Sequence, residues 1–148
     1  MAEAITLQAV DAIALRLQQI TVANGFRTDA GQSVHTEPQQ LPAGAGPRLT
    51  VWMDRVTLEQ VTNDLREWRM QIIVEAEAAS THTTSQRQAH AVMADVFQVF
   101  PSMWVRLQVS GRELDVFGEA AEFRARIDGS LSSIAEVRLQ AVIRESAT

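Results

Sequence analysis

The chain has 148 residues, of which 46% are hydrophobic and 21% charged; this is the composition of a folded chain of single-domain size and excludes disorder of the whole protein. A formal net charge of −5 argues against a dedicated nucleic-acid binder, which usually presents a basic face. The sequence contains no cysteine, which excludes disulfides, thiolate zinc sites and a cysteine nucleophile. We therefore expect one domain over residues 1–148.

The first segment, from about Glu3 to Ala23, is predicted to be an amphipathic helix. Its apolar residues recur at helical spacing: Leu7, Val10, Ile13, Ala14, Leu17 and Ile20. Asp11 and Arg16 interrupt this segment, so it is predicted to be neither a signal peptide nor a membrane span, and residence in a cytoplasm is the default expectation. Asn24-Gly25 is expected to end the helix, because glycine accepts the left-handed conformation.

A short hairpin and a loop are predicted next. Residues 26–28 and 32–36 flank Asp29-Ala30-Gly31, and Gly31 is expected at a positive-φ position of a tight turn. Residues 38–47 hold three prolines and two glycines, which predicts an exposed loop. Two interpretations stay open: a mobile surface loop, or an arm that orders against a neighbouring subunit. The candidate oligomer or partner interface consists of Pro42, Gly44, Gly46, Arg48 and Trp52.

Strict alternation marks the longest strand of the chain. Apolar residues at 68, 70, 72, 74, 76 and 78 alternate with mostly polar ones, which predicts a strand over Trp68–Ala78 with one buried and one wetted face. A shorter strand is predicted over Arg48–Asp54. Between the two, Thr57 and Gln60 have capping-box spacing, which indicates a brief helix within 54–65.

The second half is predicted to contain one helix and several strands. The helix covers about Gln86–Phe100, and a strand from Met103 to Val109 ends at Ser110-Gly111. Residues 112–120 are expected to form a short strand pair or a loop. Alternation over 123–127 leads into a predicted turn at Asp128-Gly129, and a last strand covers 137–143, preceded by a bulge or loop at 132–136.

Helices do not alternate regularly with strands in this order. We therefore predict an α+β fold, with a largely antiparallel or mixed β-sheet and two main α-helices packed on one face.

Motifs for catalysis or cofactor binding are missing from the sequence. It has no Gly-x-Ser-x-Gly, Gly-x-x-x-x-Gly-Lys or Gly-x-Gly-x-x-Gly pattern, and His35, His82 and His90 lack metal-ligand spacing. We therefore expect no enzyme, no cofactor and no metal. Glu67, Glu75 and Glu77 are interpreted as the solvated face of the long strand. The arginines at 124, 126, 138 and 144 either pair with them across the sheet or meet a partner's acids.

The layout of the whole chain resembles that of a known family. An opening helix leads into NGFRTDAGQSVHTE, the Pro/Gly loop LPAGAGPRLTVWM, the strand EWRMQIIVEAEA, the helix SQRQAHAVMADVFQVF and the terminal strand AEVRLQAVIRE. In this arrangement and in size the chain is similar to the tail terminator (minor tail, or tail completion) proteins of long-tailed bacteriophages.

The resemblance implies a structural virion protein that forms a homo-oligomeric, hexameric ring in the tail or neck after assembly in the host cytoplasm. Such a ring caps the tail tube protein, ends its polymerisation and attaches the head–tail connector protein. DNA passes the lumen of an acidic ring without specific binding, because like charges repel the phosphates. No membrane partner is implied, and no functional residue is transferred from the family.

Other interpretations stay open from the sequence. The first is another ring-forming neck or head–tail joining protein. The second is a small enzyme with a site assembled from scattered residues such as Glu75, Glu77 and His82. The third is a binding module with no role in assembly.

Overall fold

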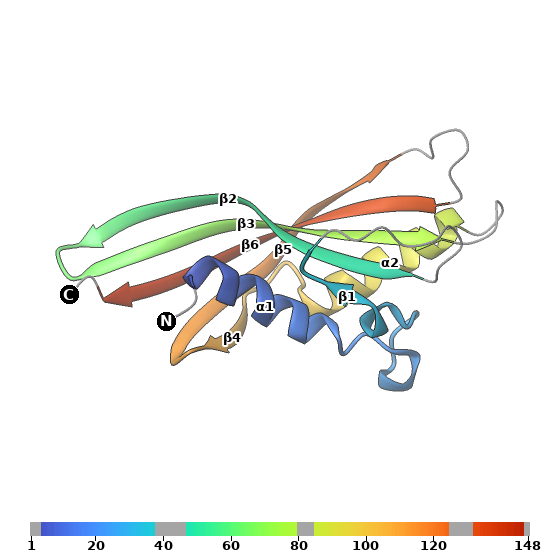
Figure 1. The fold of residues 1–148 in the computed structure, drawn as a ribbon, viewed down its shortest axis with the longest axis horizontal. Helices are drawn as coiled ribbons and strands as arrows, with labels where there is room; N and C mark the ends of the chain where they lie inside the picture. The colour runs from blue at the N-terminus through green and yellow to red at the C-terminus, as the bar shows by residue number, and fades with distance from the viewer. Residues whose placement is uncertain (1–3, 38–46, 80–84, 125–131, 147–148) are drawn as a thin grey trace.

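The computed structural model describes residues 4–37, 47–79, 85–124 and 132–146 (Figure 1). Long strands dominate it. The elements in chain order are helix α1 (Ile5–Leu17), 3₁₀ helices η1 (Val22–Asn24) and η2 (Ala30–Gln32), strands β1 (Val34–His35), β2 (Arg48–Thr62) and β3 (Leu65–Ala79), helix α2 (Ser85–Val99), and strands β4 (Val105–Val109), β5 (Arg112–Arg124) and β6 (Ser132–Ser146).

One six-stranded mixed sheet organises the described chain, with the order β1-β2-β3-β6-β5-β4. The pair β1–β2 is parallel, and the other four neighbouring pairs are antiparallel. The long strands are strongly twisted, and α1 lies beneath them in the view of Figure 1. The predicted α+β class is confirmed, and the sheet is larger than the sequence indicated.

The alternation that predicted the long strand is confirmed in β3 and in its neighbour β6. Met70, Ile72 and Val74 are fully buried, and they lie opposite the equally buried Ala141, Leu139 and Val137. Burying one such aliphatic side chain stabilises the fold by about 1.5–3 kcal/mol. The two central strands therefore carry a large share of the core.

Both predicted helices are present and join the same hydrophobic cluster as this face of the sheet. α1 is shorter than expected, because a turn intervenes between Leu17 and η1. Its buried residues are Ala9, Val10, Ile13, Ala14 and Leu17, and those of α2 include Ala89, Val92 and Val96. Neither of these helices is both long and apolar enough to cross a membrane.

The predicted hairpin around Gly31 is wrong. Residues 30–32 form η2, and β1 pairs with β2 in parallel. Gly31 is required for close approach: a Cβ there would lie 2.6 Å from the carbonyl oxygen of Ile20 and 2.7 Å from that of Leu17. The positive φ expected at Gly31 occurs instead at Gly25, which ends η1; the long helix that Gly25 was expected to end stops earlier, at Leu17.

The brief helix predicted within residues 54–65 is also wrong. β2 continues to Thr62 and pairs with β3, and the hairpin closes at Asn63-Asp64. Val56 and Leu58 alternate with Thr57 and Glu59, so the strand period is present in the sequence. The capping-box spacing misled the prediction because a strand partner as long as β3 outweighs a weak local helix signal.

Two expectations about the last strands are corrected. Residues 112–120 belong to one strand, β5, and neither a short strand pair nor a loop is found there. The bulge or loop expected at 132–136 is not found in β6, which pairs with β3 without a register shift over its described length. Bulges lie instead in β5, between Gly118 and Ala120, and in β2, between Met53 and Arg55 and between Gln60 and Thr62. The turn at Ser110-Gly111 is confirmed, with φ of 48° and 80°. The predicted Asp128-Gly129 turn lies outside the described residues.

Candidate functional site

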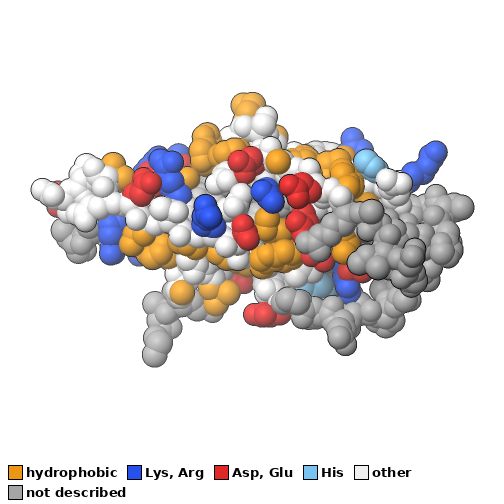
Figure 2. All heavy atoms as spheres, turned by 90° about the horizontal axis from the view of Figure 1, so that it is seen from above, with side chains coloured by type: hydrophobic (Ala, Val, Ile, Leu, Met, Phe, Trp, Pro, Cys, Tyr) orange, Lys and Arg blue, Asp and Glu red, His pale blue; other side chains and the backbone are white. Residues whose placement is uncertain are grey.

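The face of the sheet turned away from the helices is the main described surface on which polar side chains gather; we call it the outward face. On β3 it carries Glu67, Arg69, Gln71, Ile73, Glu75 and Glu77. Figure 2, a view from above, shows acidic and basic side chains interspersed with hydrophobic ones. The outward face is therefore neither uniformly acidic nor an apolar patch.

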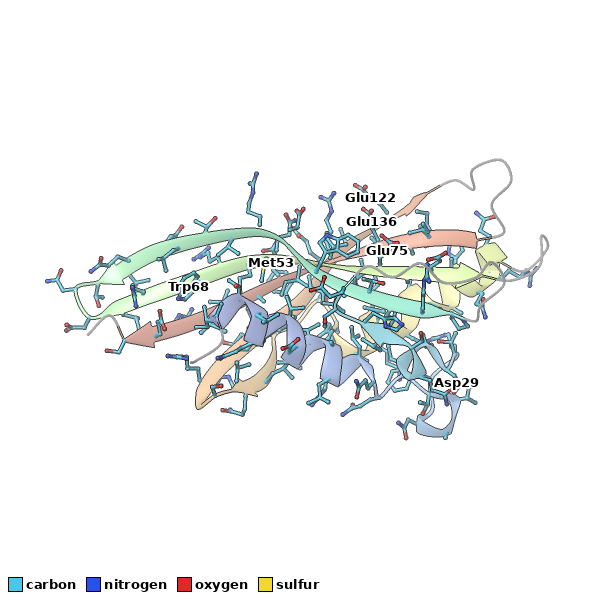
Figure 3. The ribbon with its side chains drawn as sticks, viewed as in Figure 1. Asp29, Met53, Trp68, Glu75, Glu122 and Glu136 are labelled. Atoms are coloured by element: carbon cyan, nitrogen blue, oxygen red, sulfur yellow. The ribbon has the colours of Figure 1, made fainter. Side chains whose placement is uncertain are left out.

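Three glutamates form a row across three adjacent strands near one end of this face. Glu75 of β3 lies directly opposite Glu136 of β6, and Glu136 lies directly opposite Glu122 of β5. Figure 3 shows the three side chains gathered on one side of the sheet. Like charges directly opposite each other lower the stability of a sheet. Arg138 reduces this repulsion by forming an ion pair with Glu122, with 3.6 Å between Nη2 and Oε1. We call these three glutamates the acidic row; it ends with Glu122 on β5.

At the other end of the face, Glu67 is held between two arginines. Arg69 Nε donates to its Oε1 at 2.6 Å, and Arg144 Nε donates to its Oε2 at 2.9 Å. Glu67 is only 4% exposed, so the expectation of a solvated glutamate was wrong here. Burial acts to raise the pKa of Glu67, but the two arginine hydrogen bonds and charges outweigh it and leave the pKa below its usual value.

A shallow hollow of about 410 Å³ lies beside this ion pair, lined by residues that include Arg112, Asp115, Arg144 and Glu145. Its acids are already paired. Asp115 accepts from Arg106 Nε at 2.9 Å, and Glu145 accepts from Trp68 Nε1 at 2.8 Å. The charge of Asp115, through that hydrogen bond, raises the pKa of Arg106. Such neutralised pairs are poor acids and bases, so the hollow does not resemble a catalytic pocket.

The predicted interface residues are only partly described. Pro42, Gly44 and Gly46 lie outside the described residues. Arg48 begins β2 and pairs within its own chain, with Nε donating to Glu77 at 2.7 Å. Trp52 is half-buried on the outward face, opposite Ile73. The structure does not bring Arg48 and Trp52 together into one contact, and their role in an interface stays a prediction.

The residues suspected in the enzyme alternative do not converge on a described pocket. Glu75 and Glu77 project from the same face of β3, and His82 lies outside the described residues. His35 contacts Ser33, with 3.0 Å between Nε2 and Oγ, and His90 stacks on Phe123. Within residues 4–37, 47–79, 85–124 and 132–146, no group of three or more His, Asp or Glu residues is arranged to hold a metal ion.

The sequence analysis missed the most deeply buried carboxylate, Asp95 of α2, which is 0% exposed. It accepts hydrogen bonds from the backbone N–H groups of Arg27 and Thr28 at 3.0 and 2.9 Å and from the Thr28 hydroxyl at 2.8 Å. An acid within the apolar stripe of the predicted helix was the available signal. Its role is to fix the segment between η1 and η2 onto α2.

Two long strand edges have no strand beside them in the described part of the chain. β1 pairs only with Leu49 and Thr50, so β2 is uncovered from Val51 to Thr62. On the opposite side of the sheet, β4 pairs with β5 up to Val116, and the N–H of Gly118 donates to the carbonyl of Pro101, which leaves residues 119–124 uncovered. Such edges present unpaired N–H and C=O groups and invite pairing with another chain.

The fold has counterparts among solved structures. A chain in a structure described as "Virion of native gene transfer agent (GTA) particle" matches with a TM-score of 0.65, covering 95% of this chain and 96% of that chain at 16% identity. A second solved structure, whose name states no function, matches with a TM-score of 0.59 at 16% identity, covering 95% and 96%. At this identity the likeness shows the fold alone.

Comparison of sequences adds nothing to these structural matches. No protein-family model matches the chain. No curated protein matches it. The fold, the surface and the resemblance in layout are therefore the features of this chain that bear on its function.

Proposed function

We propose that this chain is a structural protein of a virion that assembles into a closed ring, in the manner of the tail terminators that its layout resembles. The observation that carries the proposal is the similarity of fold to a chain of a gene transfer agent virion over 95% of the length. The paired acids of the outward face agree with a structural role, because they are arranged for contact and not for proton transfer.

In the proposed role the ring caps the end of a tail tube, stops its polymerisation and binds the head connector. The net charge of −5 suits a lumen through which DNA passes, because an acidic wall repels phosphates. Subunits of a ring meet through heterologous contacts, and the two uncovered strand edges lie on opposite sides of one subunit, as such contacts require.

Light scattering and negative-stain imaging of the purified chain test the ring. We expect a discrete closed oligomer, whose abundance rises when the tail tube protein of the same particle is added. A chain that stays monomeric at high concentration with the tube protein present would contradict the proposal.

A second experiment separates a terminator from another neck protein. Polymerising tube protein is mixed with the chain, and tube length is measured by electron microscopy. A terminator shortens and caps the tubes, whereas a neck protein leaves tube length unchanged and binds the connector in a pull-down.

A further inference from the structure

The direction of the long strands determines how two copies can meet edge to edge. β2, β3, β6 and β5 follow one another across the sheet, and each is antiparallel to its neighbour. The first and fourth strands therefore run in opposite directions. A copy rotated about a ring axis and placed with its β5 beside β2 pairs with it in antiparallel fashion, which continues the pattern inside the sheet.

One pair of charged residues on the two edges is complementary. Arg55 is exposed on the outward face of β2, and no described residue forms an ion pair or side-chain hydrogen bond with it. Glu122 is exposed on the outward face of β5, where the acidic row ends. Pairing β5 with β5 would bring two such acidic rows together, so the charges favour a β2–β5 contact.

Apolar side chains near these charges fit the same contact. Val56 is 38% exposed on the helix-side face of β2, and Phe123 is 41% exposed on the same face of β5. With Arg55 opposite Glu122, antiparallel pairing places Val56 opposite Ala121, and the bulge at Asp54 sets Phe123 opposite Met53 on the same face. The contact then removes part of the exposed surface of Val56 and Phe123 from water.

The register follows from the ladders and their bulges. Across one sheet Glu122 lies level with Thr50, and the bulge at Asp54 leaves four ladder positions from Thr50 to Arg55, so neighbouring copies are offset by about four residues along the strands. Arg124 then falls opposite Trp52, beyond β1, which covers Leu49 and Thr50. The segment of β5 that β4 covers ends at Val116, which falls opposite Gln60, so β2 has to leave this edge beyond Thr57.

The offset agrees with the geometry of a closed sheet. Four residues correspond to about 13 Å along the strands, and four strands span about 19 Å across the sheet. The resulting strand tilt is about 35°, at the lower end of the range of roughly 35–45° found in closed barrels.

We propose that residues 52–57 on the uncovered edge of β2 pair in antiparallel fashion with residues 120–124 of β5 in a second copy, with Arg55 beside Glu122 of that copy. Repeating the contact closes the sheets of all subunits into one wall around the lumen. The inference rests on the proposed ring, because it names the contact by which the ring forms.

Engineered cysteines test the register without interference, because the chain has no native cysteine. Thr57 and Ala120 fall opposite each other on the outward face, so the double variant Thr57→Cys/Ala120→Cys should cross-link between copies under mild oxidation. The matched control, Thr57→Cys/Glu113→Cys, places the second thiol on the same face of β5 but about six ladder positions, or roughly 20 Å, from register.

We expect the first double variant to give a ladder of covalent oligomers up to the full ring, with at least tenfold more cross-linked product than the control. Native-sized rings with equal or no cross-linking in both variants would overturn the edge pairing while leaving the ring intact. A wild-type chain that is monomeric by light scattering would instead overturn the ring itself.

Charge reversal provides a second readout. Arg55→Glu and Glu122→Arg, each alone, place like charges at every contact and should raise the concentration for half-assembly about tenfold. An equal mixture of the two variants restores opposite charges at every contact when the subunits alternate, and it should assemble as the wild type does. Failure of the mixture to assemble, with both variants folded by circular dichroism, would overturn the proposed pairing.

Discussion

The carboxylate of Asp95 holds Thr28 through a single oxygen, Oδ2, which accepts the backbone N–H at 2.9 Å and the side-chain hydroxyl at 2.8 Å. Its other oxygen accepts the backbone N–H of Arg27 at 3.0 Å. A fully buried carboxylate is costly unless its lone pairs are satisfied, and here four donors from one segment satisfy them, the fourth being Arg27 Nη1, 3.3 Å from Oδ1.

Replacing this carboxylate should therefore be among the most destabilising polar substitutions. Asp95→Asn turns one acceptor oxygen into an N–H₂ group that faces N–H donors, and we expect a loss of about 2–4 kcal/mol in the free energy of unfolding by urea denaturation. Asp11→Asn, at an exposed position of α1, is the matched control and should change stability by less than about 0.5 kcal/mol. Equal effects of the two substitutions would contradict this account of Asp95.

Gly118 should tolerate no side chain. Its N–H donates to the carbonyl of Pro101 at 2.8 Å, and an added Cβ would press on the carbonyl oxygen of Phe100 and the ring of Phe97. Gly118→Ala is expected to destabilise the fold by about 1–3 kcal/mol, because the end of α2 must move away from β5. Ala120→Ser, two residues along at an exposed site, serves as control. A thermal melt in which both variants match the wild type would rule out this close packing.

Glu67 should make stability depend on acid pH. Its folded-state pKa is lowered from 4.5, so its contribution is complete above that value and is lost as pH falls through the lower folded pKa. We expect Glu67→Gln to lose about 1–2 kcal/mol at pH 7, and the difference from wild type to shrink as pH is lowered. Glu59→Gln removes an exposed partner 3.7 Å from Arg69 and should show almost no effect. Urea titrations at several pH values provide the measurement; a difference that grows in acid would contradict the predicted sign.

Substitution of Arg48 tests whether this residue acts within the fold or in an interface between subunits. Because its guanidinium pairs with the half-buried Glu77, Arg48→Gln should lower the free energy of unfolding by about 1 kcal/mol and leave ring assembly unchanged. Arg55→Gln is the matched comparison on the same strand and should weaken assembly with little change in stability. Light scattering measures assembly, and denaturation measures stability. If Arg48→Gln weakened assembly and Arg55→Gln did not, Arg48 would belong to the interface, as predicted from the sequence, and Arg55 would not.

Local periodicity determined much of the fold. Alternation from Trp68 to Ala78 and from Val137 to Ile143 is sufficient to predict the two central strands, and the apolar stripe from Ala89 to Phe100 predicts α2. These signals succeed because a face that packs against a core repeats with the period of its own backbone. The class of fold follows from the order of such segments.

Only the tertiary structure decided what depends on neighbours distant in sequence. Residues 54–65 carry weak signals for both helix and strand, and pairing with β3 selects the strand. Gly31 looked like a turn glycine, whereas the end of α1 requires its small size. Glu67 was predicted to be solvated, but in the fold it is paired with Arg144, which lies 77 residues away in the sequence. The carboxylate of Asp95 likewise accepts hydrogen bonds from a segment 67–68 residues away. The free edges of β2 and β5 likewise follow from sheet order. A sequence states each residue's own preference, but burial, charge pairing and strand partners are properties of contacts that form only when the chain folds.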